Sequence, residues 1–504
     1  MSGGSRRAGL ALGAGLLLPL AFAPFGLWPL AMLAPAVLVA LVVGSGARAR
    51  GAFWLGWCFG LGMFGAGVWW IQVSVHQFGV PFYVFSVSVT ALFVAGMALY
   101  PGLFAAALAA GASRAGPVRA LLAAPALWVL IELLRGWLFT GFPWLSLGYG
   151  QVDGPLAGYA PMLGVSGISA VVMAIASSLA GAVLYRGRAL GVAVAISALA
   201  LAGGAALARL EPTQALGAPL EAALVQGNVP QSVKWDPARR AQTIARYREL
   251  SAAHWDADVV VWPETAIAAF PQEVPELLRA LDAEAGAAGS TLLIGMPSGE
   301  PWNGEYYNSL LAFGATRGRY DKRHLVPFGE FFPFKRQLEG LAALLDIPLS
   351  DFSAGRSDAG TLPVAGHLAG ISICYEDAFG RETIAALPRA ALLVNVSNDA
   401  WFGDTIAPHQ HLEIARMRAL ESGRWLLRGT NTGITAVIDH RGRVTARAPA
   451  FTATTLRAAF EARGGLTPYA RLGDWPLLGL ALVVLALSVW RGRPAARGDA
   501  ARSR

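Results

Sequence analysis

Three polar side chains of complementary chemistry lie in the second half of the chain: Glu264, Lys322 and Cys374. A thiol becomes a strong nucleophile once it loses its proton. A carboxylate within reach can take that proton and later return it to a leaving group. A lysine ammonium nearby favours the thiolate and stabilises the oxyanion of a tetrahedral intermediate. Together the three residue types suit acyl transfer in two steps through a thioester.

Each of these residues also has an ordinary structural interpretation. Glu264 could cap a turn, Lys322 could form a surface ion pair, and Cys374 could pack in the core as a small hydrophobic side chain. A lone cysteine with partners elsewhere in the chain is only a candidate nucleophile. The other cysteine, Cys58, lies in a long apolar run, so the sequence predicts neither a disulfide nor a metal cluster built on cysteines.

The elements that would position the three residues are strands alternating with helices. Strands are expected at 221–228, 257–264, 291–297, 308–314, 367–375, 391–398 and 433–439, where Val, Ile and Leu precede polar or turn residues. Helices are expected at 237–254, 275–288 and 409–423. This alternation predicts an α/β domain with strands buried on both faces. Because ligands bind beyond the carboxyl ends of strands in open α/β sheets, the three candidate residues are expected to converge on one crevice.

The composition of the whole chain is that of a membrane protein. Charged residues make up 14% of the 504 residues, against roughly 25% in an average soluble domain. Runs without Lys, Arg, Asp or Glu cover 8–47, 51–113, 154–185 and 189–208. Since a span needs ~20 mostly apolar residues, we expect spans near 8–24, 27–43, 52–73, 84–110, 120–134, 156–185, 189–208 and 475–490. The predicted organisation is a membrane domain at 1–209, an α/β domain at 210–474, a last span at 475–490 and a basic tail at 491–504.

The positions of the arginines predict the orientation of these spans. Residues 1–209 hold 10 basic and 2 acidic residues, whereas 210–490 hold 25 basic and 29 acidic residues. The basic residues of the first part flank alternate spans, so the positive-inside rule places both termini in the cytoplasm and 210–474 outside it. The net charge of +8 is therefore a topology signal and does not indicate a nucleic-acid partner. A cleaved signal peptide ending near Ala21-Phe22-Ala23 is the less favoured alternative, because apolar sequence resumes at once.

Several motifs in 210–474 resemble the nitrilase, or carbon–nitrogen hydrolase, superfamily, whose catalytic set is Glu, Lys and Cys in that chain order. The motifs are Trp262-Pro263-Glu264, Lys322-Arg323-His324-Leu325-Val326-Pro327-Phe328-Gly329-Glu330, Cys374-Tyr375-Glu376 and Asn395-Val396-Ser397-Asn398-Asp399-Ala400-Trp401-Phe402. Together with spans on both sides of the domain and the loop Thr140-Gly141-Phe142-Pro143-Trp144, they make the whole chain resemble a membrane-anchored branch of that superfamily, the apolipoprotein N-acyltransferases.

The resemblance implies a four-layer αββα sandwich in the periplasm and an enzyme of the bacterial inner membrane. It implies transfer of an acyl chain from a phospholipid to the free α-amine of a diacylglyceryl-modified N-terminal cysteine on an apolipoprotein. In that scheme Glu264 is the general base, Lys322 stabilises the oxyanion and Cys374 carries the acyl thioester. The scheme needs no cofactor and no metal.

The resemblance also assigns supporting roles to four residues. Glu330 and Glu376 match further essential carboxylates of the family, and Tyr375 and Trp235 match residues needed there for the second step or for substrate binding. The apolar residues Phe331-Phe332-Pro333-Phe334 and the run 341–345 suit contact with lipid or an acyl pocket, and a loop packed on the domain is the equal alternative. With Trp235, the aromatic residues after Glu330 are candidates for a cover that excludes water from the thioester.

Two other classes of function stay open on the sequence. A membrane-tethered amidase or nitrilase would use the same three residues with water as acceptor. A transporter or receptor would only bind a ligand, but the matching pairs of short or broken spans typical of transporters are not evident. Two smaller clusters are interpreted structurally: Glu132 and Arg135 as an ion pair, and the segment from His409 to Glu413 as a helix start and not a metal site.

Overall fold

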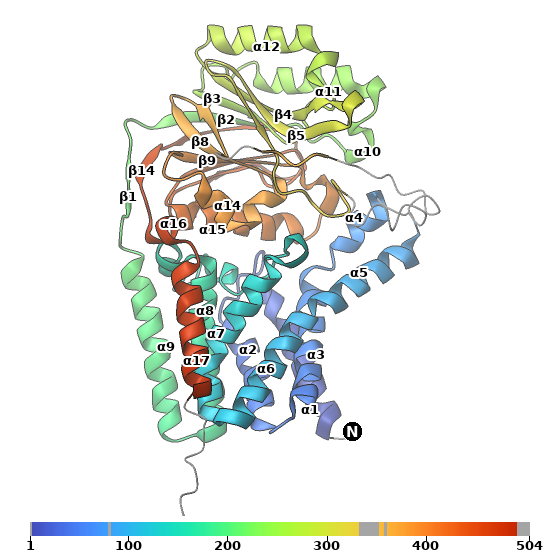
Figure 1. Ribbon diagram of the computed structural model, residues 1–504. Helices are drawn as coiled ribbons and strands as arrows, with labels where there is room; N and C mark the ends of the chain where they lie inside the picture. Colours follow the sequence, from blue (N-terminus) through green and yellow to red (C-terminus); the bar gives the residue numbers. More distant parts are fainter. Residues whose placement is uncertain (1–2, 79–81, 332–351, 357–359, 491–504) are drawn as a thin grey trace, which may run out of the picture.

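The computed structural model describes residues 3–78, 82–331, 352–356 and 360–490, and it has a helical half below an α/β half (Figure 1). Most of the apolar segment expected to touch lipid (332–334 and 341–345) and the basic tail 491–504 lie outside the described residues. The two halves share one chain path: helices come first, then the α/β half, then a last helix that returns to the helical half.

The helical half is built from one short helix of 8 residues, α4, and from apolar helices of 15 to 26 residues. They are α1 (Gly3–Leu17), α2 (Leu30–Gly44), α3 (Ala49–Gly67), α4 (Ile71–Phe78), α5 (Tyr83–Met97), α6 (Leu99–Ala115), α7 (Pro117–Arg135), α8 (Ala160–Tyr185), α9 (Arg188–Leu207) and α17 (Trp475–Trp490). Four described segments are long and apolar enough to cross a membrane, with α5 and α6 counted as one, and the bent pair α3 and α4 gives a fifth. The chain is therefore a membrane protein, while eight spans and the predicted domain boundaries stay predictions.

The α/β half contains two six-stranded sheets. The first has the order β13-β2-β3-β4-β5-β6, with bounds Thr454–Phe460, Leu220–Gln226, Val259–Trp262, Thr291–Glu300, Glu305–Gly314 and Gly318–Asp321. The second has the order β12-β11-β10-β9-β8-β7, with bounds Val444–Arg447, Ala436–Ile438, Leu426–Thr430, Leu392–Ser397, His367–Ile373 and Thr361–Val364. In the first sheet β2, β3 and β4 run parallel, and in the second β8, β9 and β10 do.

The two sheets pack face to face, and helices cover both outer faces. Leu224 and Val261 of the first sheet share a buried cluster with Ile371 and Val394 of the second. The outer face of the first sheet is covered by α11 (Pro237–Ser251) and α12 (Pro275–Ala287). The outer face of the second sheet is covered by α14 (Gly380–Ala385) and α15 (Ala407–Ser422). The predicted αββα sandwich is confirmed.

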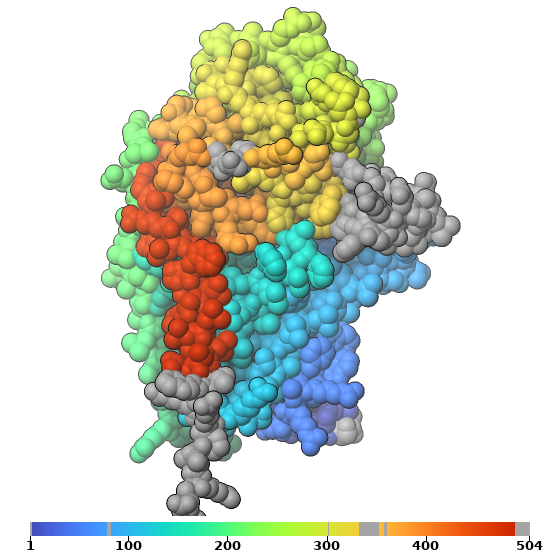
Figure 2. Space-filling view, in the orientation of Figure 1, coloured from blue at the N-terminus to red at the C-terminus, as the bar shows by residue number. Residues whose placement is uncertain are grey.

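The layer formed by α14 and α15 lies between the second sheet and the helical half (Figure 1). Ile414 and Met417 of α15 belong to the same buried apolar cluster as residues of α2, α3 and α8. The chain enters and leaves the sandwich side by side, since β1 (Thr213–Ala215) pairs antiparallel with β14 (Arg463–Gly465). Figure 2 shows α17, in red, on the outside of the helical half, directly below the orange part of the sandwich.

Glu132 and Arg135 were expected to bond to each other as an ion pair, but their hydrogen bonds go to other groups. Glu132 Oε1 accepts hydrogen bonds from Trp128 Nε1 at 2.8 Å and from the main-chain N–H of Leu147 at 2.9 Å. The Arg135 guanidinium donates to the main-chain oxygens of Phe142 and Trp144. Both side chains thus hold the loop between α7 and α8. Spacing on a helix predicted a contact between neighbours, but the unpaired main-chain groups of the buried loop were the stronger partners.

Candidate active site

The three candidate catalytic residues follow the ends of three strands; strands were expected at Glu264 and at Cys374, whereas the strand before Lys322, β6 (Gly318–Asp321), was not expected. Glu264 follows β3 after Pro263, which lacks an N–H and so cannot extend the strand's ladder. Lys322 follows β6 directly, and Cys374 follows β8. Cys374 has a φ of 54°, in the left-handed region that a side chain disfavours by about 1–3 kcal/mol. The chain is thus turned sharply at the thiol.

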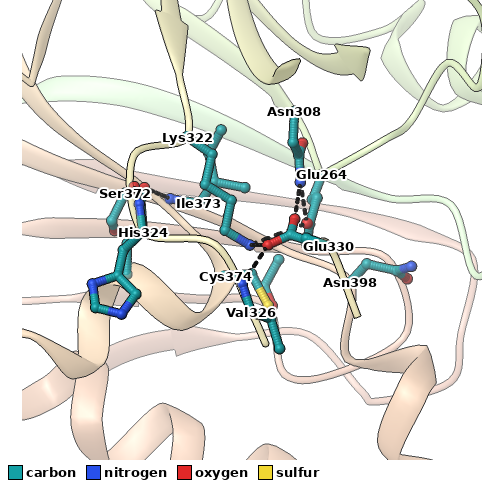
Figure 3. A network of polar contacts seen from close by, with 12 residues as sticks. Glu264, Asn308, Lys322, His324, Val326, Glu330, Ser372, Ile373, Cys374 and Asn398 are labelled. Atoms are coloured by element: carbon teal, nitrogen blue, oxygen red, sulfur yellow. Dashed lines mark hydrogen bonds and ion pairs between the residues drawn. The ribbon is translucent and has the colours of Figure 1, made fainter. Parts of the chain in front are cut away.

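Asn308 and Glu330 join Glu264 and Lys322 into one polar network (Figure 3). The Asn308 side-chain amide donates to Glu264 Oε1 at 2.7 Å and to Glu330 Oε1 at 2.9 Å. Lys322 Nζ lies 2.8 Å from Glu330 Oε2 and 4.0 Å from Glu264 Oε1. Figure 3 shows the Cys374 sulfur beside the converging ends of these side chains. Glu264 Oε2 is buried and has no hydrogen-bond partner within the described residues, so it is available to accept a proton.

The charges of the network set the ionisation of the thiol and the amine. Burial raises the pKa of the Cys374 thiol, the Glu264 carboxylate raises it further, and Lys322 offsets this only in part. Burial alone would lower the pKa of Lys322, but the carboxylates of Glu330 and Glu264 and the nearby Cys374 outweigh it and raise that pKa. The resting state therefore has a neutral thiol beside a permanent ammonium. The thiol proton must leave during the attack and needs an acceptor at hand.

Glu376 is a structural anchor for the turn at Cys374 and does not contact the reacting groups. Its carboxylate accepts hydrogen bonds from the main-chain N–H groups of Arg323 at 2.7 Å, His324 at 3.1 Å and Ile373 at 2.8 Å, and from Tyr320 Oη at 2.9 Å and 3.0 Å. Burial raises the pKa of Glu376, while Lys322 and the three main-chain donors lower it. One carboxylate therefore ties the segment after Lys322 to the strand that ends at Cys374.

Tyr375 connects the candidate nucleophile, Cys374, to the helical half. Its hydroxyl donates to the main-chain oxygen of Gly141 at 2.9 Å, and its ring stacks on Trp144 with centroids 6.3 Å apart. Trp144 Nε1 donates to Gln410 Oε1 of α15 at 2.8 Å. The loop between α7 and α8, fixed by Glu132 and Arg135, thus contacts the residue next to the candidate nucleophile.

Trp235 stands at the surface near the site, while the lysine before it is buried. The indole of Trp235 is 50% exposed at the end of the short helix α10 (Gln231–Lys234). Lys234 is 4% exposed and donates to the main-chain oxygen of Glu264 at 2.9 Å.

A second buried network lies beneath Cys374. His411 on α15 stands between Asp377 and Asp399 at 3.0 Å from each, and Arg428 of β10 contacts both carboxylates. His411 Nε2 also lies 3.3 Å from the main-chain oxygen of Cys374. His411 and Glu413 belong to helix α15 as expected, and within the described residues no group of His, Cys, Asp and Glu is placed to hold a metal ion.

Sequence reasoning missed three residues of the site: Asn308, Lys234 and His411. Asn308 was assigned to a strand, which is correct, but its amide gave no signal that it would bridge two carboxylates from other segments. Lys234 stands in a short polar stretch, where a lysine is ordinarily solvated. The segment from His409 to Glu413 was interpreted as a helix start, which is correct, but it gave no signal that the His411 ring would lie between two buried aspartates.

This sandwich, with Glu, Lys and Cys at the ends of its strands and helices that suit a membrane, defines a membrane-anchored protein with a carbon–nitrogen hydrolase domain. A family model described as carbon–nitrogen hydrolase matches residues 221–469, and one described as the apolipoprotein N-acyltransferase N-terminal domain matches residues 14–178. A carbon–nitrogen hydrolase superfamily protein from Xanthomonas campestris is 19% identical, with a TM-score of 0.37 over 49% of this chain and 92% of that one. An amidase from Nesterenkonia is 16% identical, with a TM-score of 0.37 over 52% of this chain and 97% of that one.

The similarity to curated proteins extends over nearly the whole chain. The apolipoprotein N-acyltransferase of Methylococcus capsulatus is 46% identical over 96% of this chain and 96% of its own length. That of Vibrio vulnificus is 40% identical over 95% and 96%, and that of Pseudomonas paraeruginosa is 41% identical over 97% and 97%. The chain belongs to the apolipoprotein N-acyltransferase family.

Proposed function

We propose that the chain transfers an acyl chain from a phospholipid to the N-terminal α-amine of a diacylglyceryl-cysteine apolipoprotein. The observation that carries the proposal is the buried thiol of Cys374 beside Lys322 and the unpartnered oxygen of Glu264. The apolipoprotein N-acyltransferases that cover nearly its whole length support the same substrates. The inner membrane, with the sandwich on its periplasmic side, is the location that the distribution of arginines supports.

The first half-reaction loads the thiol. The Glu264 carboxylate takes the proton of Cys374 as the sulfur attacks the ester carbonyl carbon of the phospholipid. The Lys322 ammonium stabilises the oxyanion that forms. When the intermediate collapses, the carbon–oxygen bond breaks, the lysophospholipid oxygen takes the proton back from Glu264, and the acyl group remains on Cys374 as a thioester.

The second half-reaction discharges the thioester to the acceptor. The neutral α-amine attacks the thioester carbon, Glu264 takes a proton from the attacking nitrogen, and Lys322 again faces the oxyanion. The carbon–sulfur bond then breaks and Glu264 returns the proton to the sulfur. Apolar surroundings favour the amine over water at this stage, and half-exposed Trp235 supports a role in receiving the second substrate.

Glu330 and Glu376 are proposed as supporting residues with different tasks. Glu330 contacts Lys322 Nζ directly and shares Asn308 with Glu264, so it fixes the ammonium against the base. Glu376 acts through the main chain by holding the turn at Cys374. Tyr375 sets the height of that turn above the helical half through Gly141.

Intact-mass measurement of the purified protein tests the proposal. Incubated with phospholipid and no acceptor, the protein should gain one acyl mass, and Cys374→Ala should gain none. A diacylated lipopeptide should then remove the mass and become N-acylated. Cys58→Ala is the matched control and should load normally, because Cys58 lies in α3, far along the chain from the site. If water discharges the adduct as fast as the lipopeptide does, the protein is a hydrolase instead.

A further inference from the structure

Lys234 is a buried cation next to the candidate base, and the roles proposed above do not use it. It ends α10, is 4% exposed, and its Nζ donates to the main-chain oxygen of Glu264 at 2.9 Å. Burying an ammonium on a neutral carbonyl is costly, and a methionine would fill the same space without that cost. The presence of the charge therefore calls for a counter-charge in the site.

The titratable groups that face Lys234 belong to the proposed catalytic set. Burial lowers the pKa of Lys234 to about 8, and Glu264 and Cys374 act in the opposite direction. At neutral pH the ammonium form dominates, and it is lost as the pH rises through about 8. The charge of Lys234 thus interacts with those of the proposed base and nucleophile, which follow the ends of β3 and β8.

A count of formal charges explains what a second cation would do. Two carboxylates, Glu264 and Glu330, meet at Asn308. Lys322 is 2.8 Å from Glu330 and 4.0 Å from Glu264, so its hydrogen bond goes to Glu330. Without Lys234 the set carries one excess negative charge, and an excess negative charge resists formation of a thiolate or an oxyanion.

We propose that Lys234 is a second cationic positioning residue, which holds the main chain of Glu264 and balances its charge while Lys322 remains bound to Glu330. This inference rests on the proposed function, since it assigns Glu264 as the base. Lys234 acts through Glu264 and does not contact the reacting atoms. Its contribution falls in the first half-reaction, where negative charge builds on sulfur and oxygen.

Two variants separate the charge of Lys234 from its hydrogen bond. Lys234→Gln keeps a donor for the Glu264 oxygen and removes the charge, and Lys234→Met removes both. The rate of thioester formation without acceptor should fall on the order of tenfold or more in each, because a charge at close range shifts an ionisation by a unit or more. The native rate should decline as the pH rises through about 8, and this decline should be absent in both variants. Arg239→Gln removes an exposed cation of α11 and should leave rate and pH profile unchanged.

The results that would overturn the proposal are distinct. If Lys234→Gln has the native rate of thioester formation and the native decline near pH 8, the charge of Lys234 has no role and only its hydrogen bond matters. If Lys234→Met gives the same result, Lys234 only fills space in the core. Alkylation of Cys374 by iodoacetamide, mapped by peptide mass to exclude Cys58, gives a readout that needs no phospholipid. It should slow on the order of tenfold in Lys234→Gln, and an unchanged rate would contradict the inference. If the proposed function itself is wrong, the native protein will never be acylated by phospholipid, which is a different outcome.

Discussion

Each helical layer of the sandwich consists of two helices, but the outer layer faces solvent and the inner layer faces the helical half. Of the sixteen residues of α15, fourteen are buried, whereas α11 buries only Tyr247 and Ser251 of its fifteen. The outer layer, α11 and α12, therefore has one solvent face, as an amphipathic helix on a soluble domain does. The inner layer is buried on both faces because the helical half covers it (Figure 1).

The polar residues of the two layers accordingly do different things. On α15, Gln410 accepts from Trp70 and Trp144, and Glu413 accepts from the main-chain N–H of Ala23 at 3.0 Å. On α11, Arg248 forms a half-exposed ion pair with Glu284 of α12. Buried polar groups are strongly coupled to their partners, and exposed ion pairs are worth little. The inner layer should thus determine both the stability of the site and its position above the helical half.

Removing the charge of Asp399 is the strongest test of this difference. Asp399 is buried and bonds to His411 at 3.0 Å and to Arg428 at 3.1 Å. Asp399→Asn keeps the shape but leaves the charge of Arg428 with one counter-charge fewer, so we expect about 3–5 kcal/mol lower stability. Chemical unfolding of the detergent-solubilised protein measures it. A loss no larger than that of an exposed ion pair would remove the distinction between the layers.

The pH dependence of stability sharpens the same comparison. Burial and Arg428 lower the pKa of His411, but Asp377 and Asp399 outweigh them and raise it to about 9. A group whose folded-state pKa is raised stabilises the fold fully below its unfolded value, near 6.5, and this stabilisation is lost as the pH rises through about 9. The expected loss is on the order of 3 kcal/mol.

The matched variant isolates this one group from the others that titrate. The difference in Tm between the native protein and His411→Gln should be largest near pH 6 and should shrink toward pH 10. His409→Gln, two residues earlier on the same helix and half-buried, should not show this trend, because burial lowers the pKa of His409 and any contribution from its titration is confined to low pH. A constant difference for His411→Gln would mean that the ring is not charged in the folded state.

The sequence predicted much of the fold because its strands and helices are locally consistent. The helix expected at 237–254 is observed as Pro237–Ser251, with Asp236 accepting from the Ala238 N–H as its N-cap. The strand expected at 391–398 is observed as Leu392–Ser397. By contrast β10, with Arg428 in its centre, was not predicted, because a buried arginine looks like a surface residue until its carboxylate partners are known.

The candidate site was predicted in part for a related reason. Glu264 and Cys374 each close an apolar run, so the ends of expected strands located them, whereas Lys322 lies in a polar stretch and was identified from the motif that begins with it. Asn308 and Lys234 act through contacts with residues distant in sequence, which no local pattern encodes. Glu132 and Arg135 show the opposite error, since a local pairing rule was applied where the loop after α7 provided better partners.

Shortening Gln410 should have an intermediate effect. Gln410→Ala leaves two buried indole N–H groups, on Trp70 and Trp144, without their shared acceptor. Each unsatisfied buried donor costs about 1–3 kcal/mol, so Tm should fall clearly. Because Trp144 stacks on Tyr375, thioester formation should also slow. A Tm close to that of the native protein in Gln410→Ala would show that these hydrogen bonds are not what joins the two halves.

The smallest effect is expected on the outer layer, where the comparison predicts near neutrality. Arg248 and Glu284 have side chains 46% and 36% exposed, and such pairs contribute about 0–1 kcal/mol. We therefore expect the free energy of unfolding to change by no more than this amount in Arg248→Ala, in Glu284→Ala and in the double variant. All three should form the thioester at the native rate. The double-variant cycle isolates the interaction from the loss of each side chain. A coupling as large as that between Asp399 and Arg428 would show that the outer layer supports the site as firmly as the inner one does.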